Sequence, residues 1–174
     1  MRVIEIPGHI PDASKMISVA ALRKALEKSG IEYLVTLPES PYEVLLRELL
    51  QGSALKIIQV CRESEGMSIC SGLTYGGKTS ALLCSYKGLY NSMDSLLGVA
   101  LKTQASFLLL VSEAEQTIEK IAKSAEHGKH SVALLTTTQI PYYEIKSDND
   151  MHLIDEALAQ TKTHTHPIAI LLRW

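Results

Sequence analysis

Two glutamates lie in an acidic run that joins an apolar segment to a helical pattern. The run occupies residues 62–66, reads RESEG, and closely follows the apolar segment 56–60. The helix dipole favours the ionised form of a carboxylate in the first turn of a helix. Most acidic residues at such positions only complement the dipole. Glu63 and Glu65 are nevertheless the first candidates for chemistry, because ligands of α/β proteins bind beyond the carboxyl ends of strands.

Histidines and acidic residues near the C-terminal end are weaker candidates. His164 and His166 are two residues apart, so on a strand they would share one face. A zinc site needs three or four ligands, and no third ligand is near them in the sequence. The acidic run 147–150 (SDND) precedes a helical pattern, so capping and turn formation explain it better. We predict no metal site in this chain.

Composition argues against several classes of protein. A chain of 174 residues suits one domain with one sizeable core. The net charge of −2 and the lack of a Lys or Arg cluster argue against binding to nucleic acid or a membrane surface. No apolar run is long enough for a transmembrane helix. Three cysteines without a CxxC spacing argue against disulfides and a zinc site, so we expect a cytoplasmic protein.

Apolar runs of strand length alternate with helical patterns through most of the chain. The predicted strands are 33–37, 56–60, 80–84, 106–111, 142–145 and 168–172, and the predicted helices are 14–30, 41–50, 63–76, 88–101, 113–127 and 150–161. The run SVALL at 131–135 fits either a strand or a helical turn. The strands are continuous apolar runs, which is typical of strands buried on both faces.

This pattern predicts a doubly wound α/β fold, with a mainly parallel six-stranded sheet and helices on both faces. No repeat or linker divides the chain, so residues 1–174 are expected to form one domain. The helix 63–76 is rich in small residues, which allow it to lie close to a neighbouring backbone. Ligands are expected in the loops after the strands.

Three motifs resemble the pyrimidine-binding domain of thiamine-diphosphate-dependent decarboxylases. Glu63 is followed nine positions later by Gly72, with small and apolar residues between them. The segment 81–96 (ALLCSYKGLYNSMDSL) resembles the next strand, loop and helix of that domain, and 35–40 (VTLPES) resembles its first strand and loop. Within this family, the chain looks like the α subunit of sulfopyruvate decarboxylase and the matching half of phosphonopyruvate decarboxylase. The resemblance spans roughly residues 14–172.

The resemblance implies a role for Glu63 as the acid that activates the cofactor. In the family, this carboxylate hydrogen-bonds a ring nitrogen of the aminopyrimidine, and the resulting imino tautomer deprotonates the thiazolium carbon. Pro38 and Asn91 are implied as further cofactor-binding residues. Glu65 is the alternative to Glu63 if the register differs by two, although the spacing to Gly72 favours Glu63.

The diphosphate-binding half of such enzymes has no counterpart in this sequence. Family members hold the diphosphate and Mg²⁺ through a second domain with a Gly-Asp-Gly signature, and the chain contains no such motif. The resemblance therefore implies a β subunit that carries the diphosphate-binding domain and the Mg²⁺ ion. It also implies a hetero-oligomer, α2β2 or larger, with the site at the subunit interface and a 2-oxo acid as substrate.

The loop after the third predicted strand departs from the family pattern. Relatives commonly have Gln-Asn-Ser-Gly where this chain has residues 85–88 (SYKG), and their next glycine is Tyr90 here. Ser40, Tyr86 and Lys87 are candidate substrate contacts. Lys87 could pair with an anionic substrate tail or be a solvated surface lysine. Tyr86 could form an aromatic wall or pack at an interface.

Several readings of the function remain open from the sequence. The leading one is a decarboxylase subunit that is active only with its partner. The same scaffold also permits carboligation, in which the carbanion left after decarboxylation attacks an aldehyde. A third reading is a non-catalytic subunit of the same fold. An unrelated nucleotide-binding protein ranks lower, because no Gly-rich phosphate loop follows any strand.

Overall fold

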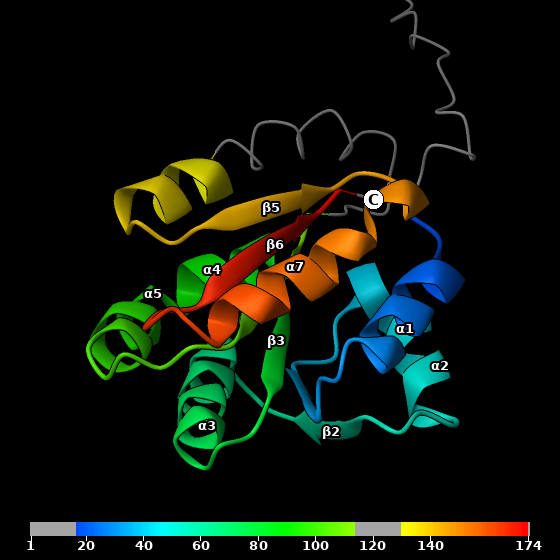
Figure 1. The fold of residues 1–174 in the computed structure, drawn as a ribbon, viewed down its shortest axis with the longest axis horizontal. Helices are drawn as coiled ribbons and strands as arrows, with labels where there is room; N and C mark the ends of the chain where they lie inside the picture. The colour runs from blue at the N-terminus through cyan, green and yellow to red at the C-terminus, as the bar shows by residue number, and fades with distance from the viewer. Residues whose placement is uncertain (1–16, 114–129, 174) are drawn as a thin grey trace, which may run out of the picture.

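A single six-stranded sheet forms the centre of the molecule. The computed structural model describes residues 17–113 and 130–173. The strand order is β2-β1-β3-β4-β6-β5 (Figure 1), and every neighbouring pair is parallel. The strands are β1 Tyr33–Thr36, β2 Lys56–Gln59, β3 Ser80–Ser85, β4 Leu108–Ser112, β5 Tyr142–Ile145 and β6 Ile168–Leu172. The predicted doubly wound fold is confirmed, and the sheet is wholly rather than mainly parallel.

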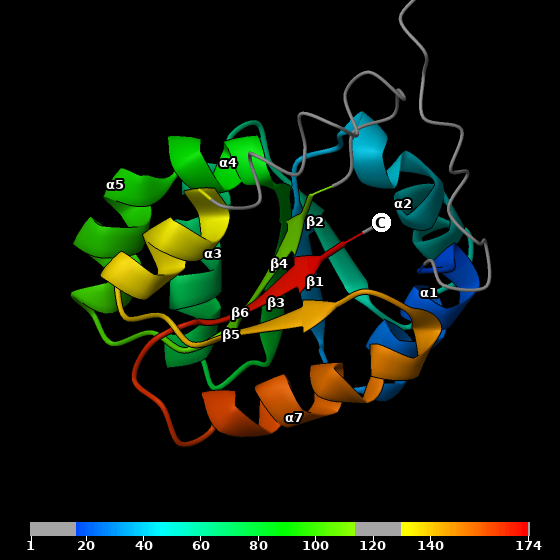
Figure 2. The same cartoon turned by 90° about the horizontal axis from the view of Figure 1, so that it is seen from above.

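Helices cover both faces of this sheet. The described helices are α1 Val19–Lys28, η2 Ser40–Tyr42, α2 Glu43–Leu50, α3 Glu63–Tyr75, α4 Tyr86–Asn91, α5 Met93–Ser95, η3 Leu96–Leu101, the helical residues 130–137, η4 Asp148–Asp150 and α7 His152–Thr161. Figure 2 shows α1, α2 and α7 on one face, and α3, α4, α5 and the helix 130–137 on the other. None of the helices described here is long and apolar enough to cross a membrane.

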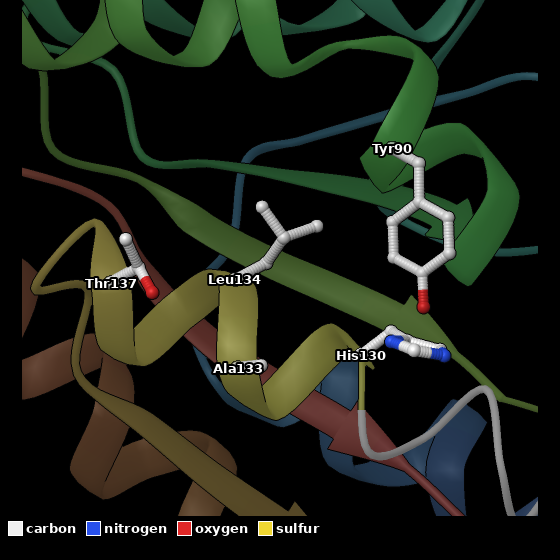
Figure 3. A pocket seen from close by; sticks show the side chains of 5 residues that line it. All are labelled: Tyr90, His130, Ala133, Leu134 and Thr137. Atoms are coloured by element: carbon white, nitrogen blue, oxygen red, sulfur yellow. The ribbon is translucent and has the colours of Figure 1, made fainter.

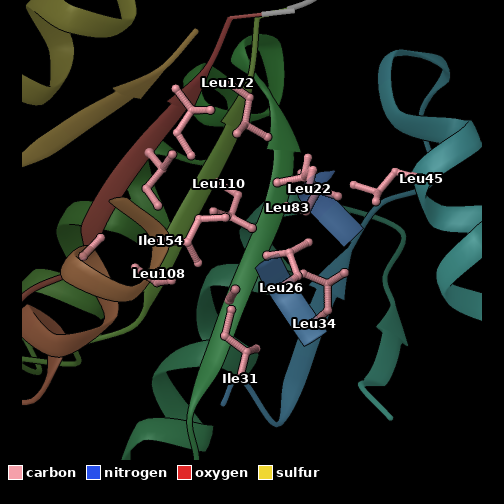
Figure 4. Close-up of a cluster of buried hydrophobic side chains, with 14 of the residues drawn as sticks. Leu22, Leu26, Ile31, Leu34, Leu45, Leu83, Leu108, Leu110, Ile154 and Leu172 are labelled. Carbon is pink, nitrogen blue, oxygen red and sulfur yellow. The ribbon is translucent and has the colours of Figure 1, made fainter. Parts of the chain in front are cut away.

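Each face of the sheet has its own apolar core, because successive strand residues point to opposite faces. Leu34 packs under α1 and α2, whereas Val35 packs under α3. Figure 4 shows the first core, where Leu22 and Leu26 of α1 meet strand residues such as Leu83. Both faces are therefore covered, which explains the continuous apolar strands in the sequence.

The strand order reverses between β1 and β3. From β1 the chain passes to β2 on one side and then to β3 on the other, so the loops after β1 and β3 diverge at the carboxyl edge. Thr36 at the end of β1 lies opposite Leu83 and donates a hydrogen bond from Oγ1 to its carbonyl oxygen at 3.0 Å. Doubly wound proteins bind ligands at such reversal points.

Two helix starts differ from the prediction. The helix predicted from residue 88 begins at Tyr86, because the Ser85 hydroxyl accepts a hydrogen bond from the Gly88 N–H at 3.2 Å and caps it. The described part of the first helix begins at Val19, where the hydroxyl of Ser18 caps the Ala21 N–H. The ambiguous run 131–135 is helical. The helix predicted over 113–127 lies outside the described residues, apart from its first position.

Candidate functional site

Glu63 occupies the first position of α3, at the carboxyl edge of the sheet. The residue is only 7% exposed, and α3 has no side-chain cap at its N-terminus. Among the described residues, we find no hydrogen bond to the Glu63 carboxylate. A buried carboxylate without a donor is costly unless a ligand or partner supplies one. Glu63 thus has the character of a binding group rather than of a helix cap.

The Glu63 side chain packs directly against Gly88 of α4. A Cβ atom built on Gly88 would lie 2.5 Å from Oε1, 2.6 Å from Cγ and 2.8 Å from Cδ of Glu63. Such distances are far shorter than van der Waals contact, so any side chain at this position would force the Glu63 side chain to move. The backbone of α4 therefore fixes where the carboxylate can lie.

The charge of Glu63 acts on the buried thiol of Cys84. Cys84 is fully buried near the end of β3. Burial raises the pKa of this thiol well above its usual range, and the charges of Glu63 and then Glu39 raise the pKa further. Glu39 and Glu63 therefore approach one thiol from the loop after β1 and from α3, which brings two acidic side chains to the reversal point.

Pro38 and Asn91, the other residues predicted to bind cofactor, are both exposed, in contrast to Glu63. Pro38 follows β1 and is exposed, and Asn91 is the exposed last residue of α4. Glu65, the alternative acid, is exposed and accepts a hydrogen bond from the Cys61 N–H at 3.2 Å. This contact gives Glu65 a local structural role, and the geometry favours Glu63 as the acid.

The candidate substrate residues lie in two elements, Ser40 in η2 and Tyr86 and Lys87 in α4. Ser40 is exposed at the start of η2. Tyr86 is buried and packs edge-on against Tyr90, with ring centroids 5.8 Å apart. Lys87 is exposed, and its Nζ lies 5.4 Å from the centroid of the Tyr86 ring. A cation over an aromatic ring at this distance is attracted to it.

A shallow hollow of about 410 Å³ lies between α4 and the helix 130–137. Figure 3 shows Tyr90 extending from α4 toward His130, with Ala133, Leu134 and Thr137 along the helix. The Tyr90 hydroxyl lies 3.3 Å from Ser131 Oγ. Tyr90 thus joins α4 to the helix 130–137.

Three features of this site were not predicted from the sequence. These are the contact of Gly88 with Glu63, the burial of Cys84 near it, and the approach of Glu39. The only signal for Glu39 was its place directly after Pro38 in the loop that resembles the family. Contacts between segments distant in sequence leave no pattern that a single chain reveals.

A buried ion-pair network closes the other half of the carboxyl edge. Arg173, after β6, forms ion pairs with Glu113 after β4 and, at 2.9 Å, with Glu144 of β5. The Glu113 N–H donates to the Leu172 carbonyl at 3.0 Å. Burial lowers the pKa of Arg173 from its usual value. These contacts tie three strands together, so we assign the network to structure.

The acidic run at 147–150 is structural, as predicted. Ser147 and Asp150 form a capping box, and Asp150 accepts the Ser147 N–H at 2.9 Å. Asp148 accepts hydrogen bonds from the N–H and the hydroxyl of Ser18. His164 Nδ1–H donates to the Gln160 carbonyl oxygen at 2.9 Å. No group of three or more potential metal ligands occurs within residues 17–113 and 130–173.

Comparison with known sequences identifies curated relatives over most of the chain. The chain is 30% identical to the sulfopyruvate decarboxylase subunit alpha of Methanococcus maripaludis, over 87% of this chain and 92% of that protein. It is 27% identical to the subunit of the same name from Methanocaldococcus jannaschii, over 87% and 90%. No protein-family model matches the chain.

Comparison with solved structures supports the fold. A benzoylformate decarboxylase from Polynucleobacter necessarius aligns with a TM-score of 0.67 and 18% identity, over 90% of this chain and 30% of that one. A 2-oxoglutarate:ferredoxin oxidoreductase from Magnetococcus marinus aligns with a TM-score of 0.66 and 16% identity, over 90% and 28%. The chain thus corresponds to less than a third of each of these longer chains.

Proposed function

This chain belongs to the family of sulfopyruvate decarboxylase alpha subunits, and on that premise we propose that it is the cofactor-activating subunit of a thiamine-diphosphate-dependent 2-oxo acid decarboxylase. It acts only with a partner that supplies the rest of the cofactor site. The name "subunit alpha" of its relatives supports a partner in general.

The observation that carries the proposal is the buried Glu63 side chain, which packs against Gly88. The Glu63 residue is 7% exposed, it follows β2 at the carboxyl edge, and its carboxylate has no hydrogen-bond donor among the described residues. A protonated aminopyrimidine ring nitrogen would donate to such an acceptor, so the residues present suit this cofactor. When bound, thiamine diphosphate supplies the electron sink that a 2-oxo acid needs in order to lose carbon dioxide.

Each neighbouring residue has a defined part in this proposal. Glu63 holds a proton shared with the pyrimidine ring, and Gly88 sets the position of the Glu63 oxygens. Pro38 and Asn91 border the ring from the loop after β1 and from α4. Lys87 attracts the anionic tail of the substrate and Ser40 contacts it, while Tyr86 supports the Lys87 side chain through its ring.

The diphosphate and Mg²⁺ belong to the partner in this account. The chain lacks a Gly-Asp-Gly sequence, and Mg²⁺ in proteins is held by carboxylates together with substrate phosphates. We propose a β subunit with the diphosphate-binding domain, a complex of α2β2 or larger, and a cytoplasmic location.

The test is reconstitution with a companion chain of similar length that carries Gly-Asp-Gly and a downstream asparagine. Carbon dioxide and aldehyde are measured with sulfopyruvate, phosphonopyruvate and pyruvate as separate substrates. The proposal predicts cofactor-dependent aldehyde formation by the complex and none by either chain alone. Acyloins as the only products would identify a carboligase instead. Absence of any decarboxylation by a well-formed complex would favour a non-catalytic subunit.

A further inference from the structure

The loop between β1 and α2 is closed by the hydroxyl of Tyr42. The Tyr42 side chain is 1% exposed and belongs to the apolar core. Its hydroxyl oxygen lies 2.6 Å from the Leu37 carbonyl oxygen and 3.2 Å from Oε2 of Glu39. Two contacts therefore tie the end of the loop to its beginning.

The number of protons in this cluster limits how the contacts are made. A carbonyl oxygen carries no proton, so at 2.6 Å the phenol donates to Leu37. A phenol has one proton, and Tyr42 cannot donate to Glu39 at the same time. Burial raises the pKa of Tyr42 above its usual range, and the charge of Glu39 adds to this effect, so the hydroxyl stays protonated.

The same loop borders the Glu63 site. It contains Pro38 and Ser40, and it leaves β1 beside the strand-order reversal. The charges of Glu39 and Glu63 both raise the pKa of the Cys84 thiol, so both side chains lie near that residue. A shift of this loop would move Glu39 relative to Glu63.

We propose that Tyr42 is a positioning residue that holds the Pro38–Ser40 loop, and Glu39 with it, against the Glu63 edge of the sheet. The ring anchors the hydroxyl in the core, and the hydroxyl fixes the loop backbone at Leu37. The effect on turnover rests on the proposed function, whereas the ordering of the loop does not.

The first test is Tyr42→Phe, which keeps the buried ring and removes only the hydroxyl. The readout is amide hydrogen exchange at Tyr42 and Glu43, whose N–H groups donate to the Glu39 and Ser40 carbonyls. Loss of one buried hydrogen bond predicts about tenfold faster exchange. The matched control is Tyr33→Phe on β1, because the Tyr33 hydroxyl accepts a hydrogen bond only from Lys56 Nζ, at 3.4 Å, among the described residues. Unchanged exchange in a folded Tyr42→Phe variant overturns the proposal.

A second test uses Glu39, which is half-exposed, so its variants should fold. A glutamine has its own amide donor and can donate to the phenol oxygen while Tyr42 donates to Leu37. Glu39→Gln should therefore slow exchange at Tyr42 and Glu43 by roughly threefold, because it adds a hydrogen bond that the wild type lacks a proton to make. Glu39→Ala should leave these exchange rates close to wild type, because the Tyr42–Leu37 bond remains. Equal exchange rates at Tyr42 and Glu43 in the two Glu39 variants would contradict the contact between residue 39 and the Tyr42 hydroxyl.

Steady-state kinetics of the reconstituted complex separate positioning from general destabilisation. Tyr42→Phe should raise KM about tenfold with a smaller change in kcat, because a displaced loop weakens substrate binding. A fall in kcat alone would overturn this role. Faster exchange with unchanged kinetics would confirm loop ordering and reject only the part that rests on the proposed function.

Discussion

At the scale of single residues, the candidate site depends on the contact between Glu63 and Gly88, and the sequence pointed only to Glu63. The spacing from Glu63 to Gly72 pointed to the acid, but Gly72 has no atom within 4 Å of a built Cβ. The glycine that matters for the carboxylate is Gly88, which lies in another motif and meets Glu63 only through the fold. Family spacing thus pointed to Glu63 without revealing which residue packs against its side chain.

Replacing Gly88 should displace the acid without unfolding the chain. In Gly88→Ala the new methyl group would overlap Glu63 Oε1, so the carboxylate must move. A misplaced catalytic group predicts a loss of about 100-fold in decarboxylation by the complex. The control is Gly98→Ala in η3, where the nearest atom is Asp94 Oδ1 at 4.0 Å. Wild-type turnover in Gly88→Ala would contradict the claim that Gly88 sets the position of the Glu63 carboxylate.

Buried thiols predict a loss of stability in alkali. Burial raises the pKa of Cys70 from 9.0 to about 12. Above pH 9 the unfolded state therefore binds fewer protons than the folded state, and stability falls as pH rises. In urea unfolding, Cys70→Ala should lower the free energy of unfolding by about 1 kcal/mol less at pH 10 than at pH 7. The exposed Cys61→Ala variant should show no such difference. Equal costs for Cys70→Ala at both pH values would contradict the prediction.

At the scale of elements, α3 lies close to the sheet, as its small residues predicted. A Cβ on Gly66 would lie 2.6 Å from Leu82 Cδ1 and 3.4 Å from Val35 Cγ1. Gly72, on the same helix, faces open space. Composition alone predicted close packing of the helix, but could not tell which glycine makes the contact, because the facing strands are distant in sequence.

The two glycines of α3 form a matched test of this packing. Gly66→Ala should destabilise the isolated chain by about 1–3 kcal/mol, since the extra methyl group must push Leu82 aside. Gly72→Ala should stabilise it by roughly 0.5–1 kcal/mol, because alanine is the better helix former. The measurement is urea unfolding of both variants. Similar effects of the same sign would show that α3 does not lie as close to β3 as described.

Strand positions were predictable, and helix starts less so. Strands buried on both faces read as continuous apolar runs, so β5 and β6 have the predicted bounds. The start of α4 was placed two residues late, because Ser85 acts both as the last strand residue and as the N-cap. Such a dual role is decided by hydrogen bonds and not by periodicity.

At the scale of the whole molecule, acidic side chains lie at the carboxyl edge of the sheet. The sequence contains no phosphate-binding motif. The charges of Glu63 and Glu39 both act on Cys84 at that edge, where the strand order reverses between β1 and β3. The doubly wound order explains why segments near residues 38, 63 and 88 form one site. The fold was predictable from alternating patterns, while the site required the strand order as well.

Cofactor binding should require both chains and a divalent metal. Calorimetric titration of thiamine diphosphate should give no detectable heat with this chain alone, and binding with the reconstituted complex in Mg²⁺. Removal of Mg²⁺ with a chelator should abolish binding by the complex, because the metal would supply the charge that offsets the diphosphate. Tight binding by the isolated chain would contradict the division of the site between subunits.

The most direct test of the central claim is turnover of the reconstituted complex with Glu63→Gln. Glutamine keeps the size of the buried side chain and cannot share a proton with the pyrimidine. Loss of an acid–base group predicts a fall of about 10²–10⁴-fold in decarboxylation. Glu65→Gln, at the exposed neighbour, should stay within about twofold of wild type. Unchanged turnover in the Glu63→Gln complex would contradict the account.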